Sequence, residues 1–262
     1  MICAATWRVA VALVLVLAPA SAGASGARAP VALTASPSHL ALEATGDAPV
    51  RVTNSGASRV VVDVSRAGFA LDLRRRLRIV GATGSPRSAA PWLTFRPRRV
   101  SLGPGGSASV TITSKLPPGA DPGDHDALVL FTTRRMAESG VAVRMRMGVV
   151  VVVRAPGTVV RRLALGALHF SRAGRARMLE LDVANRGNVT ESIARKRATV
   201  SLFVQGLRFA RLTADPRELR PGTRGIVQFR YRGDVHGRVT ARVEVFLDSS
   251  EHIVRRSYRI HI

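Results

Sequence analysis

The chain repeats one sequence template, and this repeat constrains the fold more than any other feature. The first copy reads V-R-V-T-N-S-G over 50–56 and L-G-P-G over 102–105. The second copy reads L-D-V-A-N-R-G over 181–187 and L-R-P-G over 219–222. Each copy continues into a segment with alternating apolar residues and then into a strand-like segment that begins with glycine. The repeat therefore predicts one β domain that is used twice.

Strand signals are dense along the rest of the 262 residues, and clean helical periodicity is missing. Short β-branched runs occur between turns rich in proline and glycine, as V-V-V-D-V (60–64), V-T-I-T (110–113) and L-V-L-F (128–131). This pattern predicts an all-β protein with two tandem immunoglobulin-like β-sandwich domains. We expect the domains to span 28–155 and 158–262, with R-A-P-G-T (154–158) as the linker.

The first 24 residues have the pattern of a signal peptide. A basic residue precedes an apolar run over 9–17, and small residues suit cleavage near Ala22 or Ala24. The run is shorter than the roughly 20 apolar residues that span a bilayer, so we expect no integral membrane span in the mature chain. The single cysteine, Cys3, would leave with the peptide. The sequence thus predicts a secreted or cell-envelope protein without disulfides.

The chain is strongly basic, with a formal net charge of +23. Lys115 and Lys196 are its only lysines, so arginine supplies nearly all of the positive charge. The arginines are scattered through both halves and aromatic residues make up only 5%, which disfavours nucleic acid as a partner. Solvated strand faces account for most of these arginines, and an anionic cell-wall polymer or lipid headgroup remains an alternative partner.

The segment 141–153 has two different faces. Its odd positions form a continuous apolar stripe that starts with Val141, Val143 and Met145, whereas its even positions are charged first and apolar later. One interpretation is a core strand that is half exposed at its start and buried on both faces toward its end. The other is an edge strand that lends alternating apolar side chains to the incomplete sheet of a partner.

Over about residues 30–156 the chain resembles the PapD-like periplasmic pilus chaperones. The resemblance rests on S-P-S-H-L-A-L-E (36–43), V-R-V-T-N-S-G (50–56), F-R-P-R-R-V-S-L-G-P-G-G-S-A-S-V-T-I (95–112), D-H-D-A-L-V-L-F (124–131) and R-A-P (154–156). It implies two immunoglobulin-like domains and a long strand that completes the sheet of a pilus subunit. Carried over by position, Val141, Val143 and Met145 would be the donated side chains.

The chain departs from that family at two charged positions. The family holds the terminal carboxylate of the subunit with an arginine in its first strand and a lysine in its long strand. The corresponding positions here are Ser38 or His39 and Val150, and none of these side chains supplies a fixed charge. The resemblance therefore implies the strand but not the two anchors.

A second, less specific resemblance covers more of the chain. The two-domain part of surface proteins that interact with WxL-domain proteins has a similar succession of motifs. Here they are an early N-x-G, a P-G turn before Ser109, L-P-P-G (116–119), G-V at 140–141, and L-x-V-x-N-x-G over 181–187. That resemblance implies binding of peptidoglycan or of a protein partner at the cell surface.

Motifs for catalysis are missing from the sequence, which has no G-x-S-x-G, P-loop, G-x-G-x-x-G or H-E-x-x-H. The acidic segment 121–126 could hold a cation through Asp121, Asp124 and Asp126, with His125 as a nitrogen ligand. Its composition also suits an ordinary turn, which we favour. We therefore expect no enzyme activity, no metal and no cofactor. In a further interpretation Trp92 and Phe95 anchor the first core, with sugar stacking as the alternative.

Together these features predict an exported, non-enzymatic module for binding or assembly in the bacterial cell envelope. Its partner would be the cell wall or a surface protein. The alternative is a periplasmic-type chaperone for pilus or surface subunits that donates the strand 141–153. We expect the first copy to bind, because only it has the long strand and the turn-rich insertion 81–91.

Overall fold

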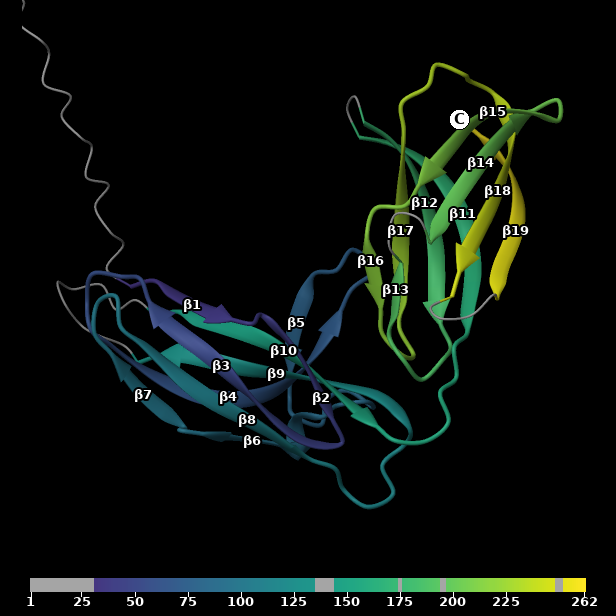
Figure 1. Cartoon of the computed structure of the whole chain (residues 1–262). Coiled ribbons are helices and arrows are strands. Elements are labelled where there is room, and N and C mark those ends of the chain that lie inside the picture. The colour runs from purple at the N-terminus through teal and green to yellow at the C-terminus, as the bar shows by residue number, and fades with distance from the viewer. Residues whose placement is uncertain (1–30, 135–143, 174–175, 194–196, 248–251) are drawn as a thin grey trace, which may run out of the picture.

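The computed structural model describes residues 31–134, 144–173, 176–193, 197–247 and 252–262. Within them the chain forms two β-sandwiches in succession, which confirms the predicted all-β fold (Figure 1). A single short 3₁₀ helix, η1 (Ala90–Trp92), interrupts the strands of the described part. None of the described helical segments has the length and hydropathy of a membrane span.

The first sandwich consists of two sheets that enclose one core. The first sheet has the order β1-β3-β8-β6, from β1 (Leu33–Ser36), β3 (Thr45–Asn54), β8 (Ser107–Lys115) and β6 (Leu93–Arg96). The second has the order β2-β10-β9-β4-β5, and β7 also pairs with β4. Its strands are β2 (His39–Glu43), β10 (Arg146–Ala155), β9 (Gly123–Thr133), β4 (Val60–Leu71), β5 (Leu77–Val80) and β7 (Arg99–Leu102).

The second sandwich packs a three-stranded sheet and a small two-stranded sheet against a four-stranded sheet. The three-stranded sheet joins β11 (Leu163–Ala173), β12 (Ala176–Asn185) and β17 (Arg224–Tyr231), and the small sheet joins β13 (Glu191–Ile193) and β16 (Arg217–Leu219). The four-stranded sheet has the order β15-β14-β18-β19, from β15 (Leu207–Thr213), β14 (Ala198–Val204), β18 (Arg238–Phe246) and β19 (Ile253–His261).

Alternating residues of facing strands fill each core, as a period of two requires. In the first sandwich Val110 and Ile112 of β8 and Phe131 of β9 are completely buried. In the second, Val227 and Phe229 of β17 are buried in the same way. Each half of the chain therefore has its own apolar core.

The repeated asparagine performs the same task in both sandwiches. The Nδ2 of Asn54 donates to the carbonyl oxygens of Ser58 (2.8 Å) and Leu102 (3.1 Å). The Nδ2 of Asn185 donates to those of Val189 and Leu219, both at 2.8 Å. In each copy the asparagine Oδ1 accepts from the backbone two residues later. Since the asparagine is buried in both copies, the template is a structural tie between a strand end and the next turn.

The P-G element of the template is the turn that this tie holds. Gly105 and Gly222 have φ of 71° and 70°, the left-handed region that glycine adopts without steric cost. Their N–H groups donate to the backbone oxygens of Asn54 (2.8 Å) and Asn185 (3.0 Å). The sequence repeat therefore corresponds to a repeat of hydrogen bonds.

Candidate partner-binding edge and domain junction

Strand β10 is a core strand along one part of its length and an edge strand along another. It pairs with β9 along its whole length, from Arg146 to Ala155. Its other edge pairs with β2, in parallel, only from Val150 onward. Among the described residues, the segment 146–149 therefore has a strand neighbour on one side only. Both interpretations of the sequence describe part of this strand.

Within the described ranges, the backbone of this open edge has no strand partner. The N–H of Val150 points away from β9, since it donates to the Ser38 oxygen at 3.1 Å. The N–H of Met145 points toward β9 and donates to Thr133 Oγ1 at 2.9 Å. Because neighbouring residues of a strand direct their backbone groups to opposite edges, Arg146 and Gly148 present N–H and C=O groups at the open edge. Such an edge is a template for another strand.

Partly buried methionines lie beside this open edge. Met145 and Met147 pack against the first core but are less buried than Val149, Val151 and Val153, which are completely buried. The Met145 sulfur accepts the N–H of Leu33 at 3.3 Å. The apolar stripe thus continues to the open end of the core. Val141 and Val143 lie outside the described residues, so their donation stays a prediction.

The outer face of β10 is less buried than the sequence predicts. Val150 and Val152 are only partly buried, so the strand is not fully buried on both faces toward its end. Val150 packs against a small apolar cluster formed by Ala67, Phe69, Leu128 and Leu130.

The structure brings together the two positions where the resembling family has charged anchors. His39 of β2 and Val150 of β10 are direct neighbours in the parallel register. The two positions to which the resemblance assigns charged anchors are therefore side by side, and neither side chain carries a fixed charge here.

The cluster on the outer face extends to the second sandwich. The guanidinium of Arg220 lies 3.7 Å from the centre of the Phe69 ring. Its Nη1 lies 3.3 Å from Oδ2 of Asp126, which is on β9 beside this cluster. Burial raises the pKa of Asp126 to about 6, although Arg220 opposes this shift. Burial also lowers the pKa of Arg220. The junction of the two sandwiches therefore contains a buried ion pair.

A second carboxylate of β9 connects both sandwiches. Asp124 accepts from Arg154 Nε (2.8 Å) at the end of β10 and from the Thr190 N–H (2.7 Å) of the second sandwich. Its own N–H donates to the Asn188 oxygen at 2.8 Å. Burial would raise the pKa of Asp124, but the hydrogen bonds from Arg154 and Thr190 outweigh burial and lower it. Unlike Asp126, Asp124 is therefore stabilised as an anion.

The segment after β4 makes a further contact at the junction. The Leu73 oxygen accepts from the Ile226 N–H at 3.3 Å and from Arg217 Nη2 at 3.1 Å. Leu73 follows β4 and precedes β5, and both strands reach toward the second sandwich in Figure 1. Two separate stretches of the first sandwich thus contact the second one, the end of β4 with the residues after it and the start of β9.

The acidic segment 121–126 is divided between a turn and the start of β9. Asp124 and His125 already belong to β9, so the preferred interpretation as a turn holds only for the residues before Gly123. Strand alternation places Asp124 and Asp126 on one face and His125 on the other. His125 packs on Trp92, with 4.3 Å between ring centroids, and its Nε2 lies 2.8 Å from the Asp121 oxygen. No group of metal-ligating side chains occurs within the described ranges.

Two other features of the first copy are parts of its packing. In the insertion 81–91, Ala89 and Ala90 are completely buried, and the Ala89 N–H donates to the backbone carbonyl oxygen of Asp126 at 2.9 Å. Trp92 and Phe95 pack against the core while remaining partly exposed. Their prediction as core anchors is therefore confirmed in part.

No family model matches the chain, and no curated protein matches it. It is similar to the class 5 fimbriae chaperone CfaA, with a TM-score of 0.50 and 14% identity over 86% of this chain and 98% of that one. The fold is that of the pilus chaperones.

Further solved structures report the same type of protein. A chain from a chaperone–tip adhesin complex of CFA/I fimbriae biogenesis has a TM-score of 0.49 and 13% identity, over 86% of this chain and 98% of that one. A chain from the Salmonella enterica complex of SafA pilin with the SafB chaperone has 0.45 and 13%, over 87% and 96%. The similarity to CfaA confirms the PapD-like resemblance at the level of fold, and the resemblance to WxL-interacting proteins stays a prediction.

Proposed function

We propose that the protein is an exported, non-enzymatic chaperone-like protein that binds a pilus-like or surface subunit through the open edge of β10. The observation that carries this proposal is the edge at 146–149, which has no strand partner among the described residues and lies beside partly buried methionines. The proposal favours the alternative function that the sequence predicts over the more general envelope-binding module. The pilus-chaperone fold supports this preference.

Binding would occur by β-strand addition. A strand of the subunit pairs with the N–H and C=O groups of Arg146 and Gly148, and this pairing depends little on the partner's sequence. The apolar stripe supplies specificity, since Met145 and the predicted Val141 and Val143 would enter apolar positions of the partner. Such burial contributes roughly 25 cal/mol for each Å² of apolar surface.

The missing anchors change how a partner is held. His39 and Val150 occupy the place where the resembling family has two fixed positive charges. Affinity in this chain then depends on backbone pairing and apolar burial, rather than on recognition of a terminal carboxylate. The salt dependence of partner binding at this edge should accordingly be weak.

Export remains part of the proposal. The pattern of a signal peptide over residues 1–24 supports it, and an extracytoplasmic location suits a chaperone-like fold.

Proline at position 148 tests the open edge directly. In Gly148→Pro the ring replaces the N–H that faces the open edge, while pairing with β9 uses the neighbouring residues. We expect loss of partner binding with little loss of stability. The tagged variant is expressed in the native bacterium, and copurifying subunits are identified by mass spectrometry.

Gly148→Ala is the matched control. A Cβ at this position lies 3.4 Å from Leu128 Cδ2 and 3.6 Å from Leu130 Cδ2, which are ordinary contacts, and the N–H is retained. The alanine variant should retain the subunit and keep it soluble on co-expression. Equal subunit yields with the proline and alanine variants, both folded by thermal melting, contradict the proposal.

A further inference from the structure

Strand β5 forms a second free edge of the sheet that contains β10. It ends the strand order β2-β10-β9-β4-β5, and among the described residues it pairs with β4 alone, from Leu77 to Val80. The open part of β10 faces the β2 side of this sheet, so the two edges lie on opposite sides of it. An occupant of the β5 edge therefore does not compete for the edge of β10.

Leu77 and Ile79 direct their backbone groups to this free edge. The carbonyl oxygen of Arg76 faces β4, where it accepts the Asp72 N–H at 3.1 Å. Because successive residues of a strand direct their N–H and C=O groups to opposite edges, Arg78 also faces β4, and the groups of Leu77 and Ile79 point away from it. A row of such groups pairs in register with an extended polypeptide, and not with a lipid or a polysaccharide.

The side chains of β5 alternate between an apolar face and a basic face. Ile79 lies beside Phe69 in the register, and Leu77 lies on the same face. Phe69 is buried in the apolar cluster on the outer surface of the sheet, whereas Leu77 is 46% exposed and Ile79 is 41% exposed. Arg78 lies on the opposite face and is exposed. The free edge thus has exposed apolar side chains on one face and a positive charge on the other.

The surroundings of this edge carry an excess of positive charge. The segment 72–78 contains four arginines and one aspartate, and Asp72 is already paired with Arg76 at 2.6 Å. A second copy of the chain would bring the same excess to the edge, and like charges on opposite strands destabilise their pairing. Acidic side chains on the incoming strand would instead be attracted to it. The charge therefore disfavours self-pairing and favours an acidic strand.

We propose that the free edge of β5 binds an extended acidic segment of another protein by strand addition. In this segment apolar and acidic residues alternate, so that one of its faces covers Leu77 and Ile79 while the other approaches Arg78. The backbone groups require a polypeptide, the two faces of β5 require this alternation, and the charge excludes a second copy. The protein can then hold a further polypeptide while a subunit occupies the edge of β10.

Fluorescence anisotropy of a labelled synthetic peptide tests the proposal with the full chain. A short peptide in which glutamate and valine alternate should bind with saturation. A peptide of the same composition, with all glutamates before all valines, should bind about ten-fold more weakly, because it has the charge without the alternation.

Two variants test the two faces of the strand separately. Arg78→Glu should weaken binding of the alternating peptide about ten-fold, because an attractive pair across the strands becomes a repulsive one. Ile79→Ser should weaken it about five-fold, since only the exposed part of this side chain remains to be covered.

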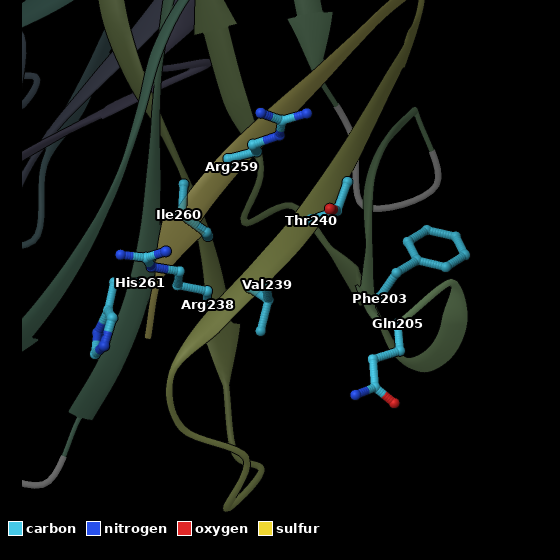
Figure 2. A pocket seen from close by; sticks show the side chains of 8 residues that line it. All are labelled: Phe203, Gln205, Arg238, Val239, Thr240, Arg259, Ile260 and His261. Carbon is cyan, nitrogen blue, oxygen red and sulfur yellow. The ribbon is translucent and has the colours of Figure 1, made fainter.

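The matched control reverses an exposed arginine on the edge strand of another sheet. Arg259 of β19 lines an open hollow of about 440 Å³ on the second sandwich, together with Arg238 and His261 (Figure 2). Arg259→Glu should leave binding of the alternating peptide nearly unchanged. Gly148→Pro, which alters the edge of β10, should leave it unchanged as well.

The outcomes separate strand addition from general attraction of acidic peptides. Equal binding of the two peptides, or an equal loss with Arg78→Glu and Arg259→Glu, indicates attraction by charge alone and overturns the proposal. Loss of binding with Gly148→Pro assigns the peptide to β10 and overturns it too, as does the absence of binding to the unchanged protein. Thermal melting confirms that each variant is folded.

Discussion

Asparagine at position 126 should make the protein more stable at neutral pH. Asp126 is largely buried at the junction of the two sandwiches, and its Oδ1 has no hydrogen-bond partner in the described part of the chain. Arg220, its counter-charge, is itself buried against the Phe69 ring. An ion pair in such surroundings does not recover the full cost of removing both charges from water.

The magnitude follows from the pKa of Asp126, which burial raises from its ordinary value of 3.8 to about 6. At 1.36 kcal/mol for each pKa unit, ionising Asp126 costs the folded state about 3 kcal/mol relative to the unfolded chain. The stability that protonated Asp126 contributes is fully present below its unfolded pKa of 3.8, and it is lost as the pH rises through its folded pKa of about 6. Asparagine imitates the protonated acid, so Asp126→Asn should match the wild type near pH 4 and exceed it by about 3 kcal/mol above pH 7.

Urea unfolding, followed by the fluorescence of Trp92, measures this difference at a series of pH values. Subtracting the two free energies of unfolding at each pH cancels the other titrating groups. Asp124→Asn is the control of opposite sign, because a lowered pKa contributes stability at high pH that is lost as the pH falls. A difference between wild type and Asp126→Asn that is constant with pH refutes the raised pKa and the buried ion pair with it.

Two other perturbations test the repeated template and the junction. Asn54→Ala and Asn185→Ala should each lower the free energy of unfolding by roughly 2–4 kcal/mol, since each leaves buried carbonyl groups unsatisfied. Urea unfolding should show similar losses for the two variants. A loss below about 1 kcal/mol in either copy contradicts the structural tie. Gly123 and Gly237 have φ of 106° and 105°, but only at Gly123 would a Cβ meet an atom of the other sandwich, the Asn188 oxygen at 2.0 Å. Gly123→Ala should therefore separate the sandwiches in small-angle scattering, whereas Gly237→Ala, with the same backbone strain, should only lower the melting temperature.

The fold could be predicted because its determinants are local. Alternating residues such as Val110 and Ile112 identify strands and their buried face without knowledge of the partner strand. The repeated Asn54 and Asn185 reveal the duplication, although the sequence does not show that both side chains bind the carbonyl before a P-G turn. The sequence predicts a turn over 121–126, because proline, glycine and aspartate are common in turns. In the structure β9 already begins at Gly123, so only the residues before it form the turn.

The site could be predicted only in part, since it depends on which strands become neighbours. The two-faced pattern of 141–153 indicates an unusual strand, but the open edge exists because β2 meets β10 only from Val150 onward. The alignment of Arg208, Arg242 and Arg259 on one outer face of the second sandwich could not be predicted, because they come from three strands that the register alone brings together. Charge scattered in the sequence is concentrated in space when strands with outward arginines pair.

The position of the domain junction on β10 has a consequence for partner binding. The junction contacts this strand near Arg154, which bonds Asp124, whereas the open edge lies around Gly148 at the strand's other end. Six residues of strand separate the two positions, about 20 Å at the rise of an extended chain. A partner strand can pair at the open edge without breaking the bonds of Asp124 or the ion pair of Asp126. The junction therefore holds the sandwiches together, while the far end of β10 keeps the edge through which we propose that a partner binds.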